Sequence, residues 1–314
     1  LDIDATRNIF NYLGKLKNKL DVRDLNLNFK KEENSILKIK KIDFSNYGYK
    51  KNKITGEIFD KKFKTSLSDD NKNFKFKILN TGIKADFNID KIDKIGSISG
   101  SSKITILNNY LRFIFALEDN QIKIMKSNLK NQDLSISFDS IILFDPFFEI
   151  SSNIYIHKID KKLLHTLSVE KILKNQEILK KLNSSSKINY IKKKFRNSII
   201  KKHYSELNLA HGRLNFLSKI YILGGDINCK GESLLTEEYP RLNFVCLFNV
   251  NDNRKLLKKF SISKNINKDS VSLNVEGSLN ILNKKINFKK INIGKNYVAN
   301  AVDMKYFKET FESI

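Results

Sequence analysis

Apolar and polar residues alternate along most of this chain, and this alternation is its dominant feature. Two examples are LNLNF at residues 25–29 and FKFKI at residues 74–78. A period of two is typical of a β-strand that has one apolar face and one polar face. The pattern recurs on the order of eighteen times, with Asn, Asp and Gly in the short connections, as in meandering all-β folds. The sequence therefore predicts a mainly β protein.

The short connections favour antiparallel neighbours, because parallel strands need longer crossovers. So many one-sided strands can hide their apolar faces in a two-sheet sandwich, in a closed sheet or in an open curved groove. We predict the third arrangement, an elongated, curved antiparallel β-sheet groove (β-taco-like) with a few amphipathic helices. The side chains that we expect to line this groove are Leu25, Leu27, Phe29, Phe74, Phe76, Ile78, Phe87, Phe113, Phe115, Leu134, Ile136, Phe138, Phe244, Phe248, Leu273 and Val275.

Three segments have the periodicity of helices. In the first, Asp4 is a predicted cap, and an apolar stripe runs from Ile9 to Leu20. The second covers about residues 158–183, and the third starts at Asp303. We expect all three to pack onto the sheet. The predicted organisation is a β-groove segment with a leading helix at 1–157, a helical insertion at 158–186, and a β-groove segment ending in a helix at 187–314.

The only two cysteines, Cys229 and Cys246, fall at apolar positions of predicted strands. The midpoint between them lies at residues 237–238, where a turn would set the strands antiparallel and the cysteines opposite each other. A disulfide there would stabilise the fold by about 3 kcal/mol in the loop-entropy account. Two free thiols that pack as small apolar residues are the alternative, and the sequence leaves both open.

The formal net charge is +24, from 58 Lys and Arg residues and 34 Asp and Glu residues. Such an excess is typical of proteins that bind nucleic acid or an anionic membrane surface. Here the basic residues are nearly all Lys and alternate with apolar residues, which indicates a solvated face. We therefore expect no nucleic-acid partner, although attraction to anionic lipid headgroups fits the charge.

Residue types that carry catalysis or bind metals do not fall at a recognisable spacing. The histidines have no His or Cys at metal-ligand spacing; they are His157, His165, His203 and His211. The sequence has no glycine-rich phosphate loop and no serine-hydrolase elbow. We predict that the protein is not an enzyme and uses no metal or cofactor.

Several stretches together carry a family resemblance. They are residues 1–68, with a Gly-opened ITGEI at 54–58; NTGIKADFNIDK at 80–91; KGESLLTEEYPRLNFVCLFNV at 230–250; VSLNVEGSLNILNKKINFKKINIG at 271–294; and AVDMKYFKETFESI at 301–314. In cadence and in glycine position, the chain resembles the AsmA-like family of bacterial envelope proteins.

This resemblance implies a repeating β-groove that is anchored in the inner membrane by an N-terminal transmembrane helix and reaches across the periplasm. Relatives are implicated in phospholipid movement toward the outer membrane and in outer-membrane assembly. The chain starts at Leu1 without such an anchor, and we expect a fragment that begins downstream of one. The family offers no catalytic residues; it implies a lining of apolar side chains.

These observations lead to one functional hypothesis and three alternatives. We expect a non-enzymatic periplasmic protein that acts in lipid binding, lipid transfer or outer-membrane assembly. Its expected partners are a phospholipid or another acyl-chain lipid and proteins of the envelope. The alternatives are an integral outer-membrane β-barrel, a structural β-sandwich interaction module and a nucleic-acid binder. The lipid-binding groove, the β-barrel and the β-sandwich differ in what covers the apolar face of the strands.

Overall fold

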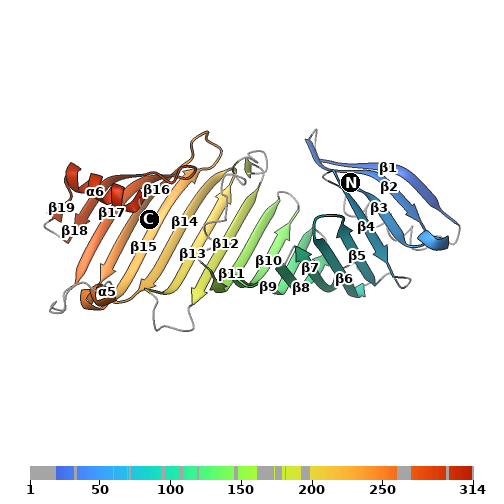
Figure 1. Cartoon of the computed structure of the whole chain (residues 1–314), viewed down its shortest axis with the longest axis horizontal. Helices are drawn as coiled ribbons and strands as arrows, with labels where there is room; N and C mark the ends of the chain where they lie inside the picture. The colour runs from blue at the N-terminus through green and yellow to red at the C-terminus, as the bar shows by residue number, and fades with distance from the viewer. Residues whose placement is uncertain are drawn as a thin grey trace. The chain divides into compact units, whose positions relative to one another are not determined.

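The computed structural model describes residues 19–31, 34–58, 60–68, 70, 72–92, 97–106, 109–118, 120–144, 148–160, 173, 179–180, 182–191, 199–259, 270–294 and 297–312. Most of them lie in strands, and the predicted mainly β, curved antiparallel fold is confirmed (Figure 1). The chain divides into two compact units, Leu1–Gln132 (unit 1) and Asp133–Ile314 (unit 2).

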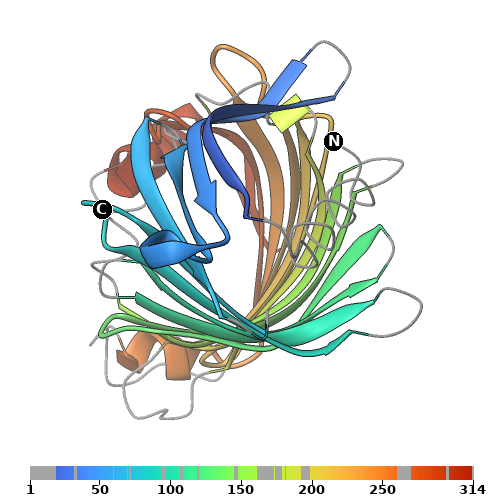
Figure 2. The same cartoon turned by 90° about the vertical axis from the view of Figure 1, so that its right-hand side faces the viewer.

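Unit 1 is an open, curved sheet in which each strand pairs antiparallel with the next along the chain (Figure 2). A 3-10 turn, η1 (Gly48–Lys50), follows the second strand. The strands are β1 (Asp21–Lys31), β2 (Asn34–Ser45), β3 (Lys53–Ile58), β4 (Lys61–Leu67), β5 (Asn73–Ile78), β6 (Ile83–Ile92), β7 (Ile98–Ile106), β8 (Asn109–Glu118) and β9 (Gln121–Lys130).

Unit 2 is also built from strands that pair in chain order. Two described helices accompany it, α5 (Asn253–Lys259) and α6 (Ala301–Glu312). The strands are β10 (Leu134–Leu143), β11 (Glu149–Ile159), β12 (Asn183–Ile191), β13 (Ile200–Ala210), β14 (Arg213–Ile222), β15 (Gly225–Leu234), β16 (Arg241–Val250), β17 (Val271–Asn280), β18 (Ile286–Ile293) and β19 (Tyr297–Val298).

One pair of strands in unit 2, β11 and β12, runs parallel. A parallel pair needs a crossover of a dozen or more residues, and residues 160–182 supply it. Within that stretch Leu173, Leu179 and Lys180 are helical, and both leucines are buried. Most of the predicted helical insertion at 158–186 lies outside the described residues, and its last four residues belong to β12, which begins at Asn183.

Strand register within each unit gathers the apolar side chains on one face. In unit 1, Phe74 lies opposite Phe87, and Phe87 lies opposite Ser102. Residues between these positions, such as Lys75 and Asp86, point to the other face. The alternation in the sequence therefore becomes one apolar face and one polar face per unit.

A β-bulge keeps the face apolar where the two-residue period slips. Between Ile39 and Ile42 the register shifts, and Lys41 has a φ of 50°. The extra residue resets the alternation, so the isoleucines on both sides of it point to the same face. Without the bulge, one of them would point to the polar face.

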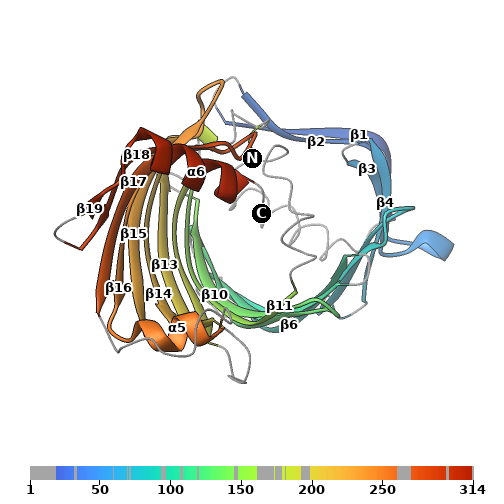
Figure 3. The ribbon, with the colours of Figure 1, turned by 60° about the vertical axis from the view of Figure 1, so that its left-hand side comes forward.

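Helix α6 packs on the apolar face of unit 2. Its Met304 and Phe307 contact the core formed by Val275, Ile291 and Ala299. Figure 3 shows α6 on the inner side of the curve formed by strands β13–β17. The apolar face of unit 2 is therefore the concave one at this end of the sheet.

The third predicted helix is confirmed, but its start differs from the predicted one. The helix begins at Ala301 rather than Asp303, because Asn300 is the capping residue. The Asn300 Oδ1 accepts the backbone N–H of Val302 and of Asp303, and Asp303 Oδ2 accepts the backbone N–H of Asn300. This reciprocal capping box satisfies N–H groups that a helix start leaves free.

Two further predictions differ from the structure or lie outside it. The leading helix from Asp4 falls on residues outside the described part of the chain, and Leu20 is not helical. The compact units divide after Gln132, whereas the predicted segments divide at 157 and 186. Residues 131–133 form a short polar turn like the other turns between strands, so the sequence pattern carries no special mark of this boundary.

Candidate functional site

The predicted lining residues of unit 1 come together on its apolar face. Register connects them across the sheet from β1 to β8. Leu25 is exposed; for Phe29 the structure describes only the strand position, opposite Leu37. The partly buried members are Leu27, Phe74, Phe76, Ile78, Phe87, Phe113 and Phe115.

Phenylalanine rings form a chain of contacts across this face of unit 1. Phe74 and Phe87 have ring centroids 5.9 Å apart, and Phe87 and Phe115 have theirs 6.2 Å apart. Phe113 continues the series, with its centroid 6.4 Å from that of Phe115. Such tilted and edge-on pairs stabilise the sheet beyond the burial of their area. The result is a broad aromatic surface whose side chains are only partly buried.

The predicted lining residues of unit 2 also share one face, which register connects from β10 to β18. Their surroundings differ along the sheet. Val275 lies in the α6 core and is only 8% exposed, so the chain itself covers it. Phe244, Phe248 and Leu273 pack against that core. The remaining members, Leu134, Ile136 and Phe138, are partly buried.

Four phenylalanine rings lie over a glycine on the neighbouring strand. A Cβ added at Gly56 would approach the ring of Phe63 to 2.8 Å, and one added at Gly277 would approach Phe244 to 3.1 Å. In each case the glycine and the phenylalanine are register partners; the other two pairs are Gly100 with Phe115 and Gly231 with Phe216. The glycine makes room for the ring to lie along the sheet, which keeps the apolar face smooth.

A row of small side chains crosses the middle of the apolar face of unit 2. Register places Ser205, Ser218, Cys229 and Cys246 opposite one another on four successive strands. We call these four the small-residue row. One neighbouring row carries Ile220, Ile227 and Phe248, and the other carries Leu207, Phe216 and Phe244. Larger apolar residues therefore flank the small-residue row on both sides, except at Gly231, which lies between Phe216 and Phe244.

The two cysteines of this row are joined by a disulfide, with an S–S distance of 2.09 Å. They are register partners on β15 and β16, and the connecting turn lies between Leu234 and Arg241. The sequence left the bonded and free forms open; the structure has the bonded form. The covalent link joins the two strands within the small-residue row.

A histidine adds a polar group beside the small-residue row. The hydroxyls of Ser205 and Ser218 lie 2.7 Å and 2.9 Å from Nε2 of His203. Burial lowers the pKa of His203 below its ordinary value, because the apolar face disfavours the charged imidazolium. At neutral pH the imidazole is therefore uncharged.

In the sequence, His203 has no His or Cys at metal-ligand spacing, and no motif singles out Ser205 or Ser218. The signal that finds them is the two-residue period. His203 and Ser205 are in phase with the apolar Leu207, so all three point to the same face.

The polar face of unit 2 carries a smaller apolar patch around a shallow hollow of about 460 Å³. Its apolar members are Tyr204, Leu217, Val245 and Leu247, of which Leu217 is 53% exposed. Lys219, Lys230 and Glu206 border them. The lining of the hollow also includes Ser205, Ser218 and Cys229 of the small-residue row, which lie between these residues along the strands.

Among the described residues, no cluster of three or more His, Cys, Asp or Glu side chains has the geometry to hold a metal ion. The part of the chain that the structure describes also has no helix long and apolar enough to cross a membrane. Comparison with protein-family models, curated proteins and solved structures finds no significant match. The AsmA-like resemblance therefore stays a prediction.

Proposed function

We propose that this chain is a non-enzymatic lipid-binding protein whose apolar faces hold the acyl chains of a phospholipid or similar lipid. The observation that carries the proposal is the partial exposure of large aromatic side chains, among them Phe74, Phe87 and Phe113, on a face that is mostly apolar. Soluble proteins rarely leave so large an apolar surface to water without a ligand or partner. Each methylene that moves from water onto such a face contributes about 0.8 kcal/mol.

Unit 2 offers the better-shaped seat for an acyl chain. The small-residue row is narrow, lined by larger apolar side chains on both sides, and neutral at pH 7 because His203 is uncharged. An acyl chain that lay in this row would contact Phe216 on one side and Ile220 on the other. In unit 1 the same lipid would meet a flatter surface of phenylalanine rings.

We further propose that the protein acts in the periplasm, anchored to the inner membrane, in lipid transfer or outer-membrane assembly. The AsmA-like resemblance implies this location, and the Cys229–Cys246 disulfide supports an oxidising compartment. Directional movement of lipid would need an energy source or a gradient outside this chain.

The direct test is to purify the chain without detergent, extract it with organic solvent and identify acyl lipids by mass spectrometry. A lysine-rich soluble protein purified in parallel controls for lipid carried along by charge. We expect acyl lipids in stoichiometric amounts in the extract of this chain only. A lipid-free extract, together with no binding of an uncharged apolar fluorescent probe, would refute the proposal.

A further inference from the structure

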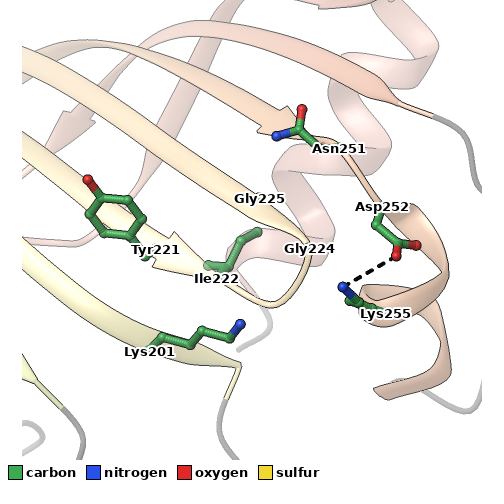
Figure 4. Close-up of a pocket in the computed structure, with 8 residues that line it drawn as sticks. All are labelled: Lys201, Tyr221, Ile222, Gly224, Gly225, Asn251, Asp252 and Lys255. Carbon is green, nitrogen blue, oxygen red and sulfur yellow. Dashed lines mark ion pairs between the residues drawn. The ribbon is translucent and has the colours of Figure 1, made fainter.

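A pocket of about 410 Å³ lies at one end of the sheet of unit 2 (Figure 4). Three segments form it: the beginning of β13, the turn between β14 and β15, and the residues that lead from β16 into α5. Its lining consists of Lys201, Tyr221, Ile222, Gly224, Gly225, Asn251, Asp252 and Lys255. None of these residues belongs to the predicted lining of the apolar face.

The main chain makes this end of the sheet rigid. The carbonyl of Gly224 accepts the backbone N–H of Asn251 at 2.8 Å and of Asp252 at 3.0 Å. Gly224 has a φ of +84°, and an added Cβ would collide with the carbonyl oxygen of Asp252. Glycine is therefore required where the turn meets the loop, and the loop holds Asp252 and Lys255 in place beside the turn.

The charges around the pocket leave an excess of positive charge. Asp252 is nearly buried and pairs with two cations, Lys255 at 3.5 Å and Arg254 at 3.4 Å. Burial raises the pKa of Asp252, but the charges and hydrogen bonds of Arg254 and Lys255 outweigh burial and hold it below its usual value. One carboxylate thus faces two cations, and Lys201 adds a third that pairs with no acidic side chain in the described part of the chain.

Two lysines line the pocket. In Figure 4 the side chain of Lys201 extends toward the Gly224 turn, and the ammonium of Lys255 points to the carboxylate of Asp252, with which it pairs. Lys201 is half-buried and Lys255 is exposed, so a ligand that enters from solvent can reach both. Asn251 adds a side-chain amide at the border of the pocket.

The pocket is continuous with the apolar face. Ile222 lines the pocket, and register places it in one row with Gly225 and Val250 at the rim of that face. A ligand with an anionic end and an apolar body can therefore contact the pocket and the rim at the same time.

We propose that this pocket binds a phosphate group, with Lys201 and Lys255 as its cationic ligands. Two ammonium groups around a small space suit a compact group with several charged oxygens, and lysine binds phosphate as a point charge. The source of the phosphate is either a free phosphate ester or the headgroup of the lipid. Only the second source rests on the function proposed above.

The test measures three ligands on the whole chain by calorimetric titration. They are glycerol 3-phosphate, the short-chain lipid dihexanoyl phosphatidylglycerol, and an uncharged apolar fluorescent probe. The variant is Lys201→Gln with Lys255→Gln; the matched control, Lys230→Gln with Lys290→Gln, removes the same charge from the polar face of the same unit.

We expect the pocket variant to lose at least about tenfold in affinity for glycerol 3-phosphate. The control should lose much less, and neither variant should change the binding of the apolar probe. An equal loss in the pocket variant and the control would refute the phosphate-binding role of the pocket, because the net positive charge of the protein would then explain the binding.

The lipid arm separates the two sources of phosphate. If the short-chain lipid binds more tightly than glycerol 3-phosphate and depends on the same lysines, the phosphate is a headgroup. Lysine-dependent binding of glycerol 3-phosphate without binding of the apolar probe would keep the pocket and refute the lipid-binding function. Binding of the apolar probe without lysine-dependent phosphate binding would do the reverse.

Discussion

The apolar faces of the two units differ in what fills them. Unit 1 presents phenylalanine rings in contact with one another, such as Phe74 on Phe87. Unit 2 presents the small-residue row between two rows of larger side chains, and α6 covers one end of its face. The same two-residue period produces both surfaces. Alternation therefore determines which face is apolar. The size of the side chains in each row determines whether that face carries contacting rings or a row of small residues between larger ones.

If the small-residue row of unit 2 is the seat for acyl chains, filling it should have the largest effect on the binding of apolar ligands. Ser218→Phe places a ring in the small-residue row, and we expect it to weaken binding of an uncharged apolar fluorescent probe by at least about tenfold, or 1.4 kcal/mol. Asn215→Phe, on the same strand but on the polar face, is the matched control and should change binding little. Equal binding by both variants and the wild type would place the acyl chain elsewhere.

The disulfide should stabilise unit 2 and leave unit 1 unchanged. Replacing both Cys229 and Cys246 by Ala is expected to lower the free energy of unfolding of unit 2 by about 3 kcal/mol, because the open loop gains conformational entropy when unfolded. Hydrogen exchange measures this as faster exchange in strands β13–β17. Strands β4–β8 should exchange as in the wild type; an equal change in both units would contradict their independence.

The rings laid over glycines make unit 1 sensitive to very small additions. Gly100→Ala brings its Cβ against the carbonyl oxygen of Asn88, which is main chain and cannot turn away. We expect a loss of about 1–3 kcal/mol in the unfolding free energy, as for other overpacked positions. Gly56→Ala meets the ring of Phe63 instead. Because a ring can tilt, Gly56→Ala should lower the unfolding free energy by less than Gly100→Ala, as measured by denaturant unfolding. A larger loss in Gly56→Ala would contradict this geometry.

Unit 2 should also respond to pH through His203, with the smallest effect of the four. Because burial lowers the folded-state pKa of His203 below its ordinary 6.5, the unfolded chain takes up a proton first as the pH falls. Stability is therefore complete above that value and declines as the pH drops from about 6.5 to the folded-state pKa. Urea unfolding of the wild type and of His203→Gln, at about pH 7.5 and pH 5, measures the difference. An unchanged pH dependence in the variant would assign it to other groups.

The sequence predicts the strands and their faces well, because both follow from a two-residue period. It also predicts that Cys229 and Cys246 meet, since a turn midway between them sets an antiparallel register. The C-terminal helix follows from its apolar stripe, but its cap at Asn300 was missed. Both Asn and Asp are common capping residues, so the local sequence does not distinguish Asn300 from Asp303 as the start of the helix.

Other features depend on contacts between distant segments, and pattern alone does not report them. Val275 has the same alternation as Phe244, yet only the docking of α6 decides that it is covered. The pocket around Lys201 and Lys255 is formed by three segments of the chain, and they lie close together because of the order of the strands. Its lysines are indistinguishable in the sequence from the many others on the polar faces.

The central claim is that acyl chains contact the apolar faces, and photo-crosslinking tests it most directly. A phospholipid with a photoreactive group on its acyl chain is bound to the whole protein chain, and the complex is irradiated. Peptide mass spectrometry then identifies the labelled residues. The account predicts labelled residues on the apolar face of unit 2, beside the small-residue row, such as Leu207 and Phe216. Labelling confined to the polar face, or spread equally over both faces, would contradict it.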